Sequence, residues 1–230
     1  MQGVRDQTLA GMQELDIASV IEHTNLSPVV TANDIAQLAA EASTYRFYGI
    51  CVPPFWVKFA KRELGPATVS LVSVVGFPMG YQMTETKLDE AKRAMDNGAD
   101  EIDWVWNTSA FKTGLPWTKV ELAKAGKLVH GQHKTLKVII EASCLSDDGI
   151  VLACKVCRDA GADFVKTSTG FVGSGATVEQ VRLIRKSLPG TVGIKASGGI
   201  KNLAQAWQML DAGATRIGTS SGVEIVKEKK

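Results

Sequence analysis

The spacing of apolar and polar residues alternates along this chain between two patterns, one typical of buried strands and one typical of amphipathic helices. Eight short runs are rich in Val, Ile and aromatic residues and end at glycine, proline or small polar residues, which is typical of buried strands. We expect strands at 20–26, 48–52, 69–77, 101–107, 136–143, 163–169, 192–197 and 216–220. Between most of them lie amphipathic segments that we expect to be helices, at 33–46, 55–64, 84–97, 116–131, 147–160, 178–188 and 202–212, with a short helix after the last strand.

The alternation of strands and helices indicates parallel strands joined by helical crossovers. Eight such units in 230 residues fit a (β/α)8 TIM barrel near its lower size limit. We therefore predict an α/β chain with a single TIM-barrel domain at 17–223, a short leading helix at 1–16 and a charged tail at 224–230. The alternative fold is an open doubly wound sheet, which is weakened because no G-x-G-x-x-G sequence follows the first strand.

The composition is that of an ordinary globular protein, 45% hydrophobic and 22% charged, with a formal net charge of +2. A nearly balanced charge gives no reason to expect nucleic acid or a membrane surface as a partner. No apolar run approaches the length of a membrane span, and the N-terminal segment lacks the apolar core of a signal peptide. These features predict a cytoplasmic protein with reduced cysteines.

The cysteine and histidine positions do not predict a metal site. Cys154 and Cys157 form a C-x-x-C sequence, but both lie on the apolar face of an expected helix, where core packing explains them. No second cysteine pair completes a zinc site. His130 and His133 precede a strand without a third ligand nearby in sequence, so we interpret them as surface residues.

Three ionisable side chains are expected to meet inside the barrel, near the carboxyl ends of the strands where TIM barrels place their active sites. In the fourth strand, Asp103 lies on the face opposite Trp104 and Trp106, whose large indoles suit the layer between strands and helices. Lys166 occupies a position where a buried strand would continue with Val or Ile, and Lys195 lies near the end of the next strand. Because buried charges are costly, a merely structural role becomes the less favoured interpretation.

Two neighbouring lysines suit covalent catalysis on a carbonyl group. A desolvated amine next to another cation loses its proton more readily, and a neutral amine is a nucleophile. One lysine can then attack while the other stays protonated, and Asp103 can stabilise that ammonium or move protons. The pattern leaves open which lysine attacks, although Lys166 has the more apolar approach and small hydroxyl neighbours, such as Thr167, that leave room for a substrate. By itself, the stretch FVKTSTGF also fits a lysine that follows the barrel rim with its charge in water.

Glycines close the last three predicted strands, where TIM barrels often hold a phosphate group on backbone N–H groups. Two serines could add hydroxyl donors there, and one lysine could add charge. The candidate phosphate-binding residues are Gly170, Gly198, Gly199, Lys201, Ser220 and Ser221. Tight turns also require glycine, but three adjacent glycine turns favour a phosphate site.

Eight sequence motifs follow one another from about Ile21 to Val223. They read IEHTNLSP, GICVPP, VVGFPMG, GADEIDWVWN, KVIIEAS, AGADFVKTSTGF, GIKASGGI and AGATRIGTSSGV. With these motifs the chain resembles the deoxyribose-phosphate aldolase family over nearly its whole length. FVKTSTGF together with KASGG is highly specific for that family.

The resemblance implies a class I aldolase that works without a metal or other cofactor. It would cleave 2-deoxy-D-ribose 5-phosphate reversibly to D-glyceraldehyde 3-phosphate and acetaldehyde, so its partners would be a phosphorylated sugar and acetaldehyde, and family habit suggests a homodimer. By motif, Lys166 would form the Schiff base and Asp103 would donate and accept protons. Lys195 would favour loss of the proton from the first lysine and relay protons.

Two positions near the first strand depart from the family pattern. Glu22 stands where the family usually has Asp, and Asn25 replaces a usual apolar residue. Glu22 and Thr24 share one face of the strand, so we expect both to support the site. Cys51, near the mouth of the second strand, is expected to be a target of reactive enals.

The residues alone leave two other functions open. A phosphosugar isomerase would use Asp103 as base and Lys195 as an electrostatic clamp, without need for a neutral amine. A third hypothesis is a barrel that binds phosphosugars without catalysis. The pairing of two inward lysines favours the aldolase over the isomerase.

Overall fold

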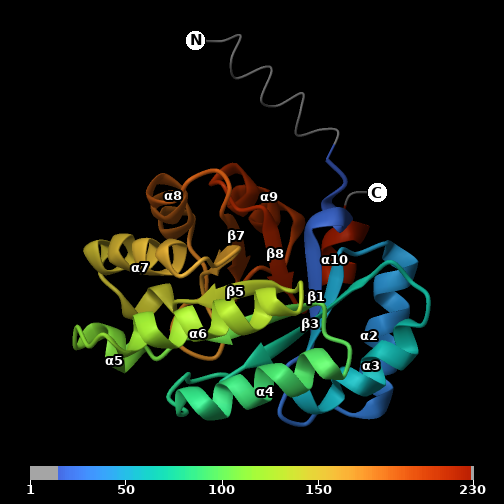
Figure 1. Ribbon diagram of the computed structural model, residues 1–230. Helices are drawn as coiled ribbons and strands as arrows, with labels where there is room; N and C mark the ends of the chain where they lie inside the picture. The colour runs from blue at the N-terminus through green and yellow to red at the C-terminus, as the bar shows by residue number, and fades with distance from the viewer. Residues whose placement is uncertain (1–14, 229–230) are drawn as a thin grey trace, which may run out of the picture.

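The computed structural model describes residues 15–228 as a closed barrel of eight parallel strands (Figure 1). The strands are β1 (Ile21–Thr24), β2 (Gly49–Val52), β3 (Ser70–Val75), β4 (Glu101–Val105), β5 (Thr135–Ile139), β6 (Phe164–Lys166), β7 (Gly193–Ser197) and β8 (Arg216–Thr219). Each strand pairs in parallel with its neighbours in chain order, and β8 pairs with β1 to close the barrel. This confirms the predicted TIM barrel and excludes the open doubly wound sheet.

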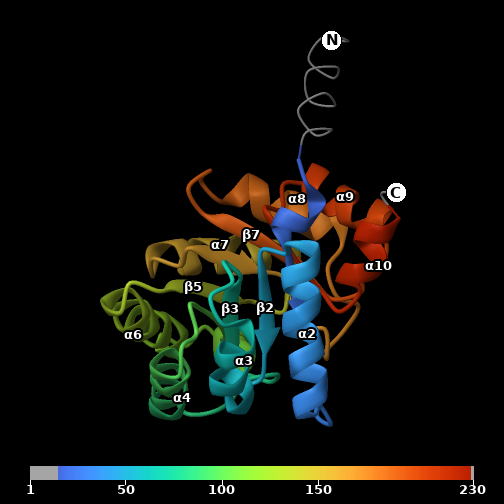
Figure 2. The same cartoon turned by 90° about the vertical axis from the view of Figure 1, so that its right-hand side faces the viewer.

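Helices follow the strands and surround the barrel (Figure 1, Figure 2). The predicted helices correspond to α2 (Ala32–Tyr45), α3 (Val57–Leu64), α4 (Thr84–Asp96), α6 (Trp117–Gly131), α7 (Asp147–Asp159), α8 (Val178–Ser187), α9 (Leu203–Asp211) and α10 (Gly222–Lys227). Three short 3-10 turns are η1 (Ile17–Val20), η2 (Pro54–Trp56) and η3 (Ala142–Cys144).

Two predicted boundaries need comment. The leading helix expected at 1–16 lies outside the described residues except for its last two positions. Residues 224–227, the first part of the charged tail expected at 224–230, belong to α10. The alternation of apolar and charged residues there continues a helix that packs against α9 and β1.

Six of the eight strands of the described chain end earlier than the hydrophobic pattern predicts, and β2 and β7 end where it predicts. β4 stops at Val105, because Asn107 caps a helix that the pattern did not predict, α5 (Thr108–Lys112), by accepting a hydrogen bond from the N–H of Ala110. The segments after β5 and β6 also leave the sheet several residues before the predicted ends. These released segments form part of the barrel rim.

Polar side chains fix the start of four helices. Thr31, Ser146, Thr177 and Asn202 each accept a hydrogen bond from a backbone N–H in the first turn of α2, α7, α8 and α9. Caps of this kind contribute about 1 kcal/mol each. Because each helix follows a βα loop, the caps also fix the loops at the carboxyl ends of the strands, where a TIM barrel carries its site.

The main hydrophobic core lies between the strands and the helices. Trp104 and Trp106 are fully buried in it, as the alternation predicts, and the indole N–H of Trp104 donates to Glu121 on α6. A second, small apolar cluster consists of Cys51, Val72 and Val74. It shares the barrel interior with charged side chains, so this barrel is not filled with apolar layers alone.

Among residues 15–228, no helix combines the length and the apolar character needed to cross a membrane. Within the same residues, His, Cys, Asp and Glu side chains form no group that could hold a metal ion. All four cysteines are free thiols, and Cys154 and Cys157 are buried on α7 as predicted.

Candidate active site

Three strands bring Asp103, Lys166 and Lys195 together inside the barrel. In the register of β6 and β7, Lys166 lies directly opposite Lys195. The Nζ atom of each lysine lies 2.7 Å from the same oxygen, Oδ2 of Asp103. All three side chains are buried. Strand alternation therefore predicts their convergence correctly.

A third lysine, which the sequence analysis missed, completes the contacts of Asp103. Lys137 on β5 is fully buried, and its Nζ atom lies 3.0 Å from Oδ1 of Asp103. It also forms an ion pair with Glu101 and lies 3.4 Å from Oε1 of Glu22. The signal for Lys137 was present, since a lysine interrupts the apolar run LKVII just as Lys166 interrupts its own strand.

Glu22 belongs to the same buried network. It accepts a hydrogen bond from Lys195, and its other oxygen lies 3.0 Å from Nη1 of Arg216 on β8. The guanidinium of Arg216 stacks 3.2 Å from the ring centroid of Tyr48, whose hydroxyl donates to Glu101. Glu22 therefore connects Lys137 and Lys195 with Arg216, which lies at the amino end of β8.

The charges of this interior do not cancel when every group is ionised. Among the described residues, four cationic side chains meet three carboxylates there: Lys137, Lys166, Lys195 and Arg216 against Glu22, Glu101 and Asp103. One cation is in surplus. Because unpaired buried charge is costly, the network favours loss of one proton.

Burial and ion pairing together determine which groups of the network are charged. Burial raises the pKa of Asp103, but Lys137, Lys166 and Lys195 outweigh it and hold the pKa well below its usual range. The pKa of Glu22 is lowered, because Lys137 and Lys195 outweigh its burial. Burial lowers the pKa of Lys137 and Lys195, but Asp103 and Glu22 outweigh it, so both pKa values are raised. At neutral pH these carboxylates are ionised and these two lysines are protonated.

A cavity of about 740 Å³ opens above this network at the carboxyl ends of the strands. Of the three interior lysines, all within the described chain, Lys166 alone is among the residues that line the cavity. Lys195 and Asp103 lie behind it. The structure thus distinguishes Lys166 from Lys195, because only Lys166 of the two lines the cavity that a ligand can enter.

Most of the predicted phosphate-binding residues line the cavity. They are Gly170, Gly198, Gly199, Lys201 and Ser220. Ser221 does not line it and instead stands at the N-cap of α10, with its N–H donating to Thr219. Thr167 is also withdrawn, since its hydroxyl accepts a hydrogen bond from the N–H of Ser197 and holds β6 against β7. Neither residue is therefore among those that line the cavity.

Two further predicted residues lie near the network. Thr24 lines the cavity, and its hydroxyl donates to the backbone carbonyl of Glu22. Cys51 is fully buried and does not line the cavity. Burial raises the pKa of its thiol to about 11, so it is a thiol at neutral pH. Its reactivity toward enals stays a prediction.

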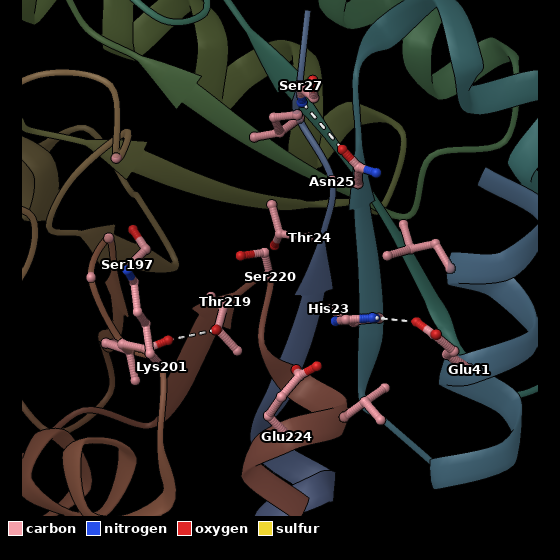
Figure 3. Close-up of a pocket in the computed structure, with 18 of the residues that line it drawn as sticks. His23, Thr24, Asn25, Ser27, Glu41, Ser197, Lys201, Thr219, Ser220 and Glu224 are labelled. Atoms are coloured by element: carbon pink, nitrogen blue, oxygen red, sulfur yellow. Dashed lines mark hydrogen bonds and ion pairs between the residues drawn. The ribbon is translucent and has the colours of Figure 1, made fainter. Parts of the chain in front are cut away.

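Two carboxylates that the sequence analysis did not single out shape the cavity walls. Glu141, which follows β5, accepts hydrogen bonds from the N–H and the hydroxyl of Thr169, at 3.1 and 2.6 Å, and so fixes the loop after Lys166. On the opposite side Glu41 of α2 lies 2.8 Å from Nε2 of His23 (Figure 3). Glu141 lies in the motif KVIIEAS and His23 in the motif IEHT. Their partners, Thr169 and Glu41, are distant in sequence, so neither motif contains a whole pair.

The fold and the site define a class: a TIM-barrel enzyme with a reachable lysine above a buried lysine–carboxylate network. Comparison with known proteins adds the family. Residues 11–228 match the sequence profile described as DeoC/LacD family aldolase. The chain belongs to this family of aldolases.

Named relatives and solved structures agree with this assignment. The chain is 48% identical to a protein of Thermococcus gammatolerans named deoxyribose-phosphate aldolase, over 94% of this chain and 97% of the relative. A protein of the same name from Thermococcus kodakarensis is 49% identical over 94% and 98%. The structure titled QR15, an aldolase, matches with a TM-score of 0.89 at 39% identity over 94% and 96%. The tetrameric deoxyribose phosphate aldolase from Aeropyrum pernix matches with a TM-score of 0.88 at 35% identity over 98% and 97%.

Proposed function

We propose that this protein is a deoxyribose-phosphate aldolase that cleaves 2-deoxy-D-ribose 5-phosphate reversibly to D-glyceraldehyde 3-phosphate and acetaldehyde through a Schiff base on Lys166. The observation that carries the proposal is the position of Lys166, which lines the cavity while its Nζ atom contacts the buried Asp103. The family membership and the names of the relatives support the same reaction.

The charge balance of the barrel supplies a reason for Lys166 to be the nucleophile. Lys137 and Lys195 have raised pKa values and stay protonated, and Arg216 is always charged. These three cations balance the three interior carboxylates. Lys166 is the fourth basic group of the interior, has a single carboxylate partner and faces the cavity. A neutral Lys166 leaves the buried network balanced, and a neutral amine can attack a carbonyl.

The reaction then follows the chemistry of an enamine. The Nζ atom of Lys166 adds to the C1 aldehyde of the open-chain sugar, and the carbinolamine loses water to form an iminium ion. Loss of the proton from the C3 hydroxyl breaks the C2–C3 bond, which releases glyceraldehyde 3-phosphate and leaves the electron pair in an enamine. Protonation of C2 and addition of water free acetaldehyde and return the amine.

Asp103 and Lys195 are placed to handle the protons of these steps. One oxygen of Asp103 lies 2.7 Å from both lysine nitrogens, so a proton can pass between them through this carboxylate. Protonated Lys195 also keeps a positive charge beside Asp103. Glu22 contacts Lys195, and Lys137 contacts Asp103, so these two residues hold the Asp103–Lys195 pair in place.

The phosphate group is assigned to the glycine loops after β6, β7 and β8. Gly170, Gly198, Gly199, Lys201 and Ser220 line the end of the cavity that these loops form. A phosphate bound there would hold the sugar with its aldehyde toward Lys166, which lowers the entropic cost of attack. We assign Thr167 and Ser221 a positioning role instead of a contact with the substrate.

Product analysis separates the aldolase from the two alternatives. With 2-deoxyribose 5-phosphate, the proposal requires release of acetaldehyde, and Lys166→Met should lower its rate by at least about 10³-fold. An exposed lysine on α8 offers a matched control, Lys186→Met, which should keep the wild-type rate. Conversion of a phosphosugar without acetaldehyde would favour an isomerase. Binding of the substrate without any turnover would leave a binding protein.

We also propose a homodimer in the cytoplasm. Apolar side chains are exposed on the loops that follow the first three strands, where Val29, Phe55, Tyr81 and Met83 are 70–84% accessible. A second copy of the chain would bury such apolar side chains and remove them from water. Sedimentation equilibrium at micromolar concentration should give twice the chain mass, and Phe55→Ser with Tyr81→Ser should shift the protein toward the monomer. A wild-type monomer at that concentration would contradict the dimer.

The proposed location in the cytoplasm is supported by the four free thiols, which fit a reducing compartment.

A further inference from the structure

Three acidic side chains line the cavity, and one of them, Glu224, has no partner within the described residues. Glu224 lies in the first turn of α10 and lines the cavity together with Lys201 and Ser220. Figure 3 shows its carboxylate directed into the cavity, on the side of Ser220 and His23. The side chain is exposed, and within residues 15–228 its carboxylate makes no hydrogen bond or ion pair.

The other carboxylates on the cavity wall are already engaged. Asp34 accepts hydrogen bonds from the N–H and the hydroxyl of Thr31 as part of a helix cap. Glu41 is bound by His23 and Gln37. Their charge is therefore satisfied by protein groups. Glu224 is the carboxylate of the described cavity wall that remains available to a ligand.

The position of Glu224 matters for the charge at the phosphate end. Lys201 is the candidate cation there, and Lys227 of α10 also lines the cavity. Glu224 offsets one of these two positive charges and so lowers the net positive charge that a phosphate group would meet. A phosphate monoester carries about −1.5 to −2 charges at neutral pH, so Glu224 repels it while Lys201 attracts it. A neutral hydroxyl group, in contrast, can donate a hydrogen bond to the Glu224 carboxylate.

We propose that Glu224 is a specificity-determining residue that weakens selection for the phosphate group and lets the site take unphosphorylated 2-deoxy sugars. The inference rests on the proposed aldolase function and concerns the same cavity. Backbone N–H groups of the glycine loops can bind either a phosphate or a sugar hydroxyl. The side-chain charges beside them therefore decide between the two substrates.

The test compares kcat/KM for 2-deoxyribose 5-phosphate and for 2-deoxyribose, in wild type and in Glu224→Gln. The ratio of the two values, phosphorylated over unphosphorylated, should rise about 3- to 10-fold in the variant, because a screened like-charge repulsion is removed. The gain should lie mainly in KM for the phosphorylated sugar. The inhibition constant of inorganic phosphate should fall by a similar factor, and both effects should shrink at high salt.

Two further variants complete the design. Lys201→Met should change the ratio in the opposite direction. Glu179→Gln is the matched control, since this carboxylate is also exposed, also lies in the first turn of a helix and does not line the cavity. It should leave the ratio unchanged.

The outcomes separate this inference from the proposed function. An unchanged ratio and an unchanged phosphate inhibition constant in Glu224→Gln, with acetaldehyde still released, would overturn the role of Glu224 and leave the aldolase intact. An equal change in Glu179→Gln would also overturn it, because the effect would then be one of overall charge. No acetaldehyde from either sugar, in wild type, would reject the aldolase itself.

Discussion

At the scale of single residues, the site depends on how the two oxygens of Asp103 are shared. Oδ2 contacts both Lys166 and Lys195, and Oδ1 contacts Lys137. The contact of Oδ1 with Lys137 fixes the orientation of the carboxylate, so that Oδ2 faces both Lys166 and Lys195. Lys137 therefore acts on the reaction through Asp103 and is a positioning residue.

Replacing Lys137 tests this role. Lys137→Met removes a buried cation that pairs with Glu22, Glu101 and Asp103, so three carboxylates lose a partner. Breaking a buried pair in this way costs about 3–5 kcal/mol, and we expect a loss of that size in the free energy of unfolding, measured with urea. Turnover should also fall, with the larger effect on kcat.

An exposed lysine supplies the control for that measurement. Lys92→Met breaks only a surface pair with Asp96 and should cost less than about 1 kcal/mol. If Lys137→Met were no more destabilising than Lys92→Met, the buried network would not hold Asp103 as we describe.

Residue-level prediction from the sequence succeeded where one strand carries its own signal. Asp103 lies opposite two tryptophans, and Lys166 interrupts an apolar strand, so alternation alone places both inside. It failed for Glu101 and Arg216, which lie at the starts of their strands, and for Lys137, although its strand carried the signal. Their partners come from strands up to 194 positions away, as in the contact of Arg216 with Glu22, and only closure of the barrel makes such partners neighbours.

At the scale of elements, the loops after β6 and β7 depend on glycine. Gly198 has a positive φ of +87°, and a Cβ atom there would lie 2.8 Å from the Cα atom of Gly175. The two loops therefore approach each other more closely than any side chain allows. This packing shapes the end of the cavity that we assign to the phosphate group.

A single methyl group should disturb that loop. Gly198→Ala forces a strained backbone angle and a backbone clash, so we expect kcat/KM for the phosphorylated sugar to fall by about 10-fold or more, mainly through KM. Gly190→Ala is the control, since no atom lies within 4 Å of a Cβ at that position. Equal kinetics in the two variants would show that the loop does not determine binding.

The element boundaries show what local patterns cannot reveal. The hydrophobic run through residues 101–107 predicts one long strand, but Asn107 accepts the N–H of Ala110 and begins α5. A side-chain cap competes with strand pairing at such a position, and the pattern of apolar residues does not record the outcome. The order and number of the strands were predictable, because eight separate apolar runs define them.

At the scale of the whole molecule, the barrel interior combines a charged network with a small apolar cluster. Removing so many charges from water is costly, and their mutual pairing compensates for the cost only when the geometry is good. Function gives a reason for keeping them, because the same network holds the protons that the proposed reaction moves. Stability should accordingly depend on pH through these groups.

The direction of that dependence follows from the shifted pKa values. The pKa of Asp103 is lower in the folded protein, so its contribution to stability is full above its unfolded pKa of about 4 and is lost as the pH falls further. The pKa of Lys195 is raised, so its contribution is full below about pH 10 and is lost above it. We expect Asp103→Asn to fold, to lose most turnover and to show a shallower loss of stability below pH 4 than wild type. Urea unfolding at several pH values measures this, and parallel curves for the two proteins would contradict the assignment.

The most direct test of the central claim is to trap the covalent intermediate. The protein is incubated with acetaldehyde and borohydride, digested and mapped by mass spectrometry. Reduction of a Schiff base leaves an ethyl group, an increase of about 28 Da, on the lysine that forms it. We expect this adduct on Lys166 of the wild-type protein and none on Lys137 or Lys195. Absence of the adduct from Lys166, with aldol cleavage intact in Lys166→Met, would contradict it.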